Sequence, residues 1–96
     1  MPTEYRLYQS YPNPFNPSAT IQFSLPRSGN VKLTIFDILG RQLATLLDER
    51  REAGDHSLVW NASGRSSGIY FYRLEVTSVS DSGKSFTQVK KMMLLK

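Results

Sequence analysis

Residues 20–25 read TIQFSL, a stretch that alternates polar and apolar side chains without interruption. Successive side chains of a β-strand point to opposite faces, so Ile21, Phe23 and Leu25 fall together on one face. A strand with one apolar and one polar face is typical of a sheet that covers a core on one side only. The stretch therefore predicts a half-buried β-strand.

The residues that follow repeat this pattern after a turn. Residues 26–30 (PRSGN) combine proline and glycine, which favour turns, and residues 31–35 (VKLTI) alternate again. The two alternating stretches together predict a β-hairpin. After a second turn at residues 37–41, residues 42–47 are apolar without a clear period, and fit either a bulged strand or one helical turn.

The second half of the chain contains the strongest strand signal. Residues 69–76 (IYFYRLEV) place Tyr70 and Tyr72 on the apolar face, after a polar loop at residues 61–68. Residues 56–60 and 86–95 predict two more strands, the last one entered through a turn at residues 80–83. No long stretch keeps a helical period, so an all-β protein is favoured.

With a short extended piece near residues 5–10, the chain has about seven predicted strands, separated by turn signals. This pattern predicts an immunoglobulin-like antiparallel β-sandwich, formed as a single domain over residues 1–96, although a barrel of the same strands remains open. The side chains expected to face inward are Ile21, Phe23, Leu33, Ile35, Leu58, Trp60, Tyr70, Tyr72, Leu74 and Val76.

Composition agrees with a folded domain, because 40% of the residues are hydrophobic and 21% are charged. No cysteine is present, so disulfides and thiolate metal sites are excluded. The apolar runs are far too short for a membrane helix, which needs about 20 residues.

Residues 1–6 are expected to be a linker beginning at an added start methionine, and any export signal is expected to lie elsewhere in the parent protein.

The net charge of +4 is concentrated near the C-terminus. Residues 84–96 contain four lysines and no acid, so the other eight basic and eight acidic residues cancel. Such a segment fits either attraction of an acidic partner or solvated lysines that discourage edge pairing of a last strand.

Apparent catalytic motifs lack the context that their chemistry needs. Residues 64–68 match G-x-S-x-G, but a nucleophile elbow requires a strand before the motif and a helix after it. His56 is the only histidine and has no metal-ligand spacing around it. Tyr70, Phe71 and Tyr72 resemble an RNA-stacking platform only superficially. The sequence thus predicts no enzyme, no cofactor, no metal, no small-molecule substrate and no nucleic-acid partner.

Residues 11–17 form the most unusual segment. They are Tyr11, Pro12, Asn13, Pro14, Phe15, Asn16 and Pro17. Three prolines forbid helix and remove backbone donors, so we expect a rigid crossing outside the sheets. It fits a structural loop clamped by Phe15 or, alternatively, a preformed recognition surface.

The chain resembles the C-terminal sorting domains, type A, of proteins exported by the type IX secretion system of Bacteroidetes and their relatives. The resemblance rests on four blocks in order: residues 11–17, residues 35–41 with Gly40, residues 60–74 with Trp60, Gly68 and Tyr70, and residues 91–96.

The resemblance implies a non-catalytic domain at the end of a larger secreted cargo protein, which would reach the cell surface. Expected partners are the outer-membrane translocon and a sortase-like surface peptidase, cutting near or before residues 3–9. The residues expected to be recognised are Lys90, Lys91, Met92, Met93, Leu94, Leu95 and Lys96, by charge and by strand addition to an exposed edge.

Two other roles remain open for the same fold, because fold alone does not fix function. One is an accessory binding or spacer module that contacts glycans or neighbouring domains. The other is the immunoglobulin-like domain of flagellar hook-capping proteins. The lysine-flanked last strand favours the sorting domain.

Overall fold

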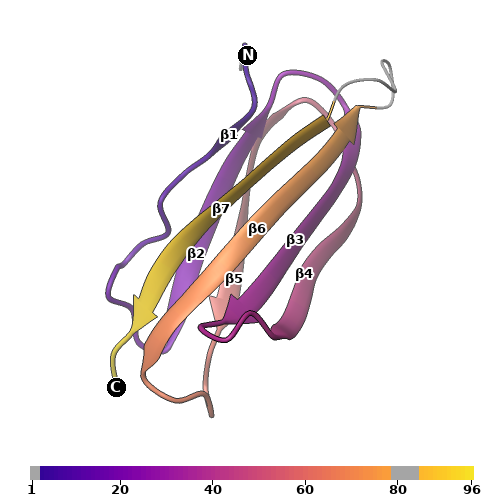
Figure 1. Cartoon of the computed structure of the whole chain (residues 1–96). Coiled ribbons are helices and arrows are strands. Elements are labelled where there is room, and N and C mark those ends of the chain that lie inside the picture. The colour runs from indigo at the N-terminus through magenta and orange to yellow at the C-terminus, as the bar shows by residue number, and fades with distance from the viewer. Residues whose placement is uncertain (1–2, 79–84) are drawn as a thin grey trace.

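The computed structural model describes residues 3–78 and 85–96, which form two antiparallel sheets packed face to face (Figure 1). One sheet has the strand order β1–β2–β5 and the other β4–β3–β6–β7. The strands are β1 (Arg6–Leu7), β2 (Ser18–Leu25), β3 (Gly29–Asp37), β4 (Gln42–Arg51), β5 (Gly54–Asn61), β6 (Gly68–Ser78) and β7 (Ser85–Leu94). The predicted all-β sandwich of about seven strands is confirmed, and the described residues contain no helix long and apolar enough to cross a membrane.

The core lies between the sheets and is built from alternate residues of the long strands. β2 contributes Ile21 and Phe23, β3 contributes Leu33 and Ile35, and each of these side chains is completely buried. Full burial of one such side chain stabilises the fold by about 1.5–3 kcal/mol. The predicted inward positions are confirmed, with Leu58 packed against this core rather than fully within it.

The predicted hairpin of residues 20–25 and 31–35 is wrong. β2 pairs with β1 on one side and β5 on the other, whereas β3 pairs with β4 and β6 in the opposite sheet. Residues 26–28 therefore carry the chain from one sheet to the other. Both strands need one apolar face in either arrangement, so alternation does not distinguish a hairpin partner from a strand that faces it across the core.

The ambiguous segment at residues 42–47 belongs to strand β4. Its pairing with β3 shifts register between Leu33 and Thr34 and again between Ile35 and Phe36. Each shift breaks the simple alternation of β4, which explains why its sequence shows no clear period. The bulged strand is thus confirmed over the helical turn. The predicted turn at residues 80–83, and Lys84 after it, lie outside the described residues.

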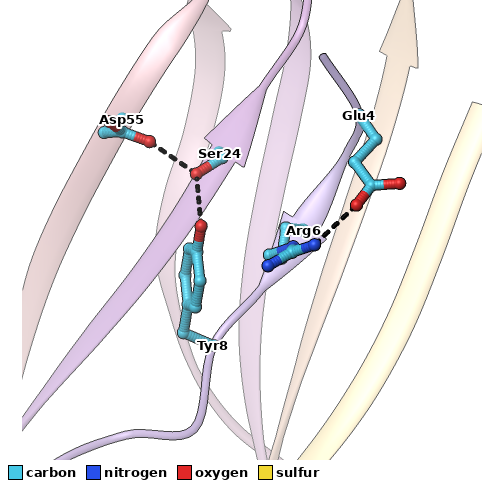
Figure 2. Close-up of polar contacts among 5 residues, drawn as sticks. All are labelled: Glu4, Arg6, Tyr8, Ser24 and Asp55. Atoms are coloured by element: carbon cyan, nitrogen blue, oxygen red, sulfur yellow. Dashed lines mark hydrogen bonds and ion pairs between the residues drawn. The ribbon is translucent and has the colours of Figure 1, made fainter. Parts of the chain in front are cut away.

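Strand β1 attaches the start of the chain to the edge of the smaller sheet. Leu7 is buried in the core, and the ring of Tyr5 stacks on Phe86 of β7 with centroids 5.4 Å apart. Figure 2 shows the polar contacts beside β1, where the Tyr8 hydroxyl lies 3.1 Å from Ser24 Oγ, which donates to Asp55 at 2.5 Å. In the same view Arg6 pairs with Glu4 at 2.6 Å. The folded unit therefore includes Tyr5 and Arg6, within the stretch expected to be a linker.

Candidate recognition surface

The four sequence blocks meet at one end of the sandwich, which we call the terminal end (Figure 1). The proline crossing (residues 11–17), the β3–β4 turn (residues 37–41), the β5–β6 loop (residues 62–67) and the end of β7 lie there. Direct contacts join them: Lys96 N–H donates to Ser67 Oγ at 3.1 Å, and Ala62 N–H donates to Pro17 O at 2.8 Å. Residues far apart in sequence thus form one continuous surface.

Phe15 clamps the proline crossing to the core, as predicted. It is the only buried residue of the crossing, and its ring lies 5.8 Å from that of Trp60. Trp60 in turn meets Tyr70 edge-on at 5.4 Å. The Tyr70 hydroxyl donates to Ser66 O at 2.6 Å, which fixes the β5–β6 loop above the cluster. Two of the sequence blocks, residues 11–17 and residues 60–74, therefore share one aromatic cluster.

The residues predicted to be recognised on β7 divide into two sets. Met92 and Leu94 are 1% exposed and belong to the core. Lys91, Met93 and Leu95 point outward, Lys96 is exposed, and Lys90 is half-buried. Strand alternation thus leaves a lysine-flanked apolar row accessible at the terminal end, while its neighbours hold the strand in place.

The expectation that the last strand offers an exposed edge for strand addition is wrong at this end, because the edge of β7 already carries hydrogen bonds to other segments. Phe15 N–H donates to Met93 O at 2.9 Å, and Leu95 N–H donates to Phe15 O at 3.0 Å. Met93 N–H donates to Asn13 Oδ1 at 3.0 Å, and Gln9 Nε2 donates to Lys91 O at 2.8 Å. An added strand would have to displace the crossing. What this part of β7 leaves open to solvent is its outward side chains.

The β3–β4 turn holds two apolar side chains in solvent. Ile38 and Leu39 are 65% and 73% exposed. Asp37 fixes the turn: its Oδ1 accepts the N–H groups of Leu39 and Arg41, both at 2.9 Å, and its Oδ2 accepts Arg41 Nε at 2.7 Å. These bonds, the one from the Arg41 N–H above all, lower the pKa of Asp37. Gly40 closes the turn at φ 82°, a conformation that glycine adopts without strain.

The sequence indicated a turn at residues 37–41 and a family block at residues 35–41, but Ile38 and Leu39 were missed as candidate contacts. Their signal was the presence of two large apolar residues at the tip of a turn, where polar residues are usual.

Positive charge is also concentrated at the terminal end. Arg41, Arg65, Lys91 and Lys96 lie in its segments, and among the described residues there the only acid is Asp37, which pairs with Arg41. The acidic residues of β4, Asp48 and Glu49, lie opposite Lys32 and Val31 near the start of β3, at the other end of the sheet. The end of the domain is therefore basic and apolar.

The G-x-S-x-G residues and His56 are not brought together. His56 stacks on Phe23 with ring centroids 5.2 Å apart and contacts Glu52 O through Nε2 at 2.8 Å. The G-x-S-x-G residues lead into β6 at the other end of β5. Within residues 3–78 and 85–96, no three histidine, aspartate or glutamate side chains gather as metal ligands would.

Comparison with known proteins identifies the family. Residues 9–93 match the family described as the secretion system C-terminal sorting domain. No curated protein matches the chain. A crystal structure of dimeric latent PorU from Porphyromonas gingivalis superposes with a TM-score of 0.71 at 24% identity, over 93% of this chain and 9% of that one. That likeness concerns the fold and confirms the immunoglobulin-like sandwich. With 85 of its 96 residues matched in order, this chain belongs to the family of type IX secretion C-terminal sorting domains.

Proposed function

We propose that the exposed side chains at the end of β7 direct an attached cargo protein through the outer-membrane translocon of the type IX system to the cell surface. The family supplies the general role of a C-terminal sorting signal, which implies a secreted carrier and an export machinery. Domains of this kind are in general non-catalytic, and we assign this chain no reaction and no cofactor. The whole chain, residues 1–96, acts as one domain in this proposal.

The observation that carries the proposal is the division of β7 into core and surface residues. Lys91, Met93 and Leu95 present a charged and apolar row to solvent, held in place by Met92 and Leu94 in the core. A rigid row of this kind binds a partner without the cost of ordering a flexible tail.

The structure also bears on where a sortase-like peptidase would separate cargo from domain. Tyr5 stacks on Phe86, and Leu7 is 2% exposed in the core. A cut beyond Tyr5 would remove packing from the folded domain. We therefore place the cut before Tyr5, and mass analysis of the released domain should find a fragment that still contains Tyr5. A fragment beginning at Leu7 or later would contradict this placement.

The role can be tested with a reporter fused ahead of this chain, carrying an N-terminal export signal, in a bacterium with a type IX system. Deleting residues 90–96 is a poor test because it removes Met92 and Leu94 from the core. The sharper variants are Lys91→Glu, Met93→Ser and Leu95→Ser, alone and combined. Val89→Ser is the matched control, because Val89 is exposed on the same face of the same strand.

The fusion with the unchanged chain should reach the cell surface, and the combined variant should stay in the periplasm while unfolding at nearly the same temperature. The Val89→Ser fusion should be exported normally. A fusion of the unchanged chain that remains in the periplasm would contradict the sorting role. Normal export of the combined variant would contradict the role of the β7 row.

The accessory glycan-binding alternative finds no support in the crossing, because Phe15 is 1% exposed and cannot stack on a sugar. Phe71 is half-buried beside Phe36, its partner in β3. No contact in the described residues favours the hook-capping alternative over the sorting role.

A further inference from the structure

The β3–β4 turn has the features of a binding element that is distinct from the β7 row. Leu39 and Ile38 are the most exposed of the large apolar side chains in the described residues. Exposed apolar side chains on a mobile loop would be unremarkable, but here Asp37 holds the turn with three hydrogen bonds. Because the turn is already ordered, burying these two side chains against a partner requires little loss of conformational entropy.

Two hollows lie at the terminal end, and the first of them borders the turn. The first, of about 340 Å³, is lined by the β3–β4 turn, the β5–β6 loop and Tyr70. The second, of about 220 Å³, lies between the proline crossing and β7, where Pro14 and Met93 line it. Ile69 lines both hollows. The two hollows therefore adjoin at Ile69, and we call them together the groove; its lining residues run from Leu39 to Met93.

The charges around this groove point to the chemistry of the occupant. Arg41 and Arg65 line the first hollow, and Lys91 lines the second. The one acid lining either hollow is Asp37, whose carboxylate is bound by Arg41 and by backbone N–H groups of its own turn. A ligand that brings negative charge and apolar side chains together would complement this surface.

We propose that this groove docks an acidic protein segment bearing apolar side chains, presented by the export machinery, with Ile38 and Leu39 as the central contacts. The inference rests on the proposed sorting role and extends the recognised surface beyond β7. A protein segment fits better than an anionic lipid surface, because the side chains of a partner segment can enter the separate hollows on either side of Ile69. The headgroups of a bilayer offer no projections of that size. Large apolar anchors seated in pockets contribute most of the affinity at protein interfaces.

The test compares variants of the groove with matched variants elsewhere. The groove variants are Ile38→Ser with Leu39→Ser, and Arg65→Glu. The controls are Val59→Ser, at an exposed apolar residue of the other sheet, and Arg27→Glu, in the β2–β3 connection at the opposite end of the sandwich. All substituted side chains lie outside the core, so thermal unfolding should show folded domains throughout.

Two measurements are made on each variant. Export of the reporter fusion is measured in cells. Binding of the purified 96-residue chain is measured with two probes, the solubilised outer-membrane translocon of the same host and vesicles of mixed zwitterionic and anionic phospholipid. We expect the groove variants to bind the translocon at least about tenfold more weakly than the controls and to be exported less.

The outcomes separate the two proposals. If the unchanged fusion is not exported, the sorting role fails. The groove inference is still supported in that case if the unchanged chain binds the translocon and the groove variants do not. If the unchanged fusion is exported and the groove variants bind and export as well as the controls, the groove inference is overturned and the sorting role stands. Binding to vesicles alone, or to neither probe, also overturns the groove inference.

Discussion

Replacing Phe15 with alanine should reveal how much of the domain's stability depends on the proline crossing. Phe15 is 1% exposed and lies 5.8 Å from the Trp60 ring. Removing a fully buried phenylalanine typically costs about 3–5 kcal/mol, which includes the cavity that it leaves. A domain of this size has a free energy of unfolding of about 5–15 kcal/mol, so the loss would be a large fraction of the total.

The same substitution should loosen the end of β7. The backbone of Phe15 bonds to Met93 and Leu95, and the Phe15 ring is the one side chain of the crossing that is buried in the core. We therefore expect the amide of Leu95 to exchange with solvent faster in Phe15→Ala than in the unchanged chain.

Urea unfolding followed by Trp60 fluorescence measures the first effect, and amide hydrogen exchange measures the second. Tyr11→Ala is the matched control, because Tyr11 belongs to the same crossing but is 50% exposed. That control should lose less than about 1 kcal/mol. If Phe15→Ala loses no more than Tyr11→Ala, or if the Leu95 amide keeps its protection, the crossing does not hold the end of β7 as described.

Three further substitutions test other contacts. Tyr72→Phe should cost about 1–3 kcal/mol in urea unfolding, because the Tyr72 hydroxyl donates to Tyr8 O and accepts from Ser10 N–H, both at 2.8 Å. Asp37→Asn should speed amide exchange at Leu39 in the β3–β4 turn, because the carboxylate that accepts its N–H is replaced by an uncharged amide. Gly29→Ala should lower the midpoint of thermal unfolding, by an amount equivalent to about 1–3 kcal/mol, because an added Cβ would lie 2.8 Å from a backbone oxygen of β6.

Two of these residues also predict a dependence on pH. Burial raises the pKa of Tyr72 above its ordinary value of 10.0. The contribution of Tyr72 to the free energy of unfolding is therefore complete below pH 10.0 and declines as the pH rises further. Tyr72→Phe should reduce this decline. The pKa of Asp37 is lowered from 3.8, so the contribution of Asp37 to the free energy of unfolding is present above that pH and is lost in more acidic solution. Equal alkaline slopes for Tyr72→Phe and the unchanged chain would contradict the first expectation.

The sequence alone was enough to predict the strands that alternate regularly and the faces that they bury, but not β4, whose bulges disturb the alternation. Alternation at residues 20–25 placed Ile21 and Phe23 in the core because the direction of a strand side chain is a local property of the extended backbone. The prolines of residues 11–17 likewise predicted a crossing outside the sheets, since proline restricts φ wherever it stands.

The tertiary structure alone decided which strands pair and which surfaces remain open. β2 and β3 face each other across the core instead of forming a hairpin, and the proline crossing occupies the edge of β7 that the sequence left free for strand addition. It also brings the turn of Ile38 and Leu39 beside the β5–β6 loop. Side-chain alternation reports whether a residue faces a core, but hydrogen-bond partners and shared surfaces depend on how segments distant in sequence meet, which no local pattern contains.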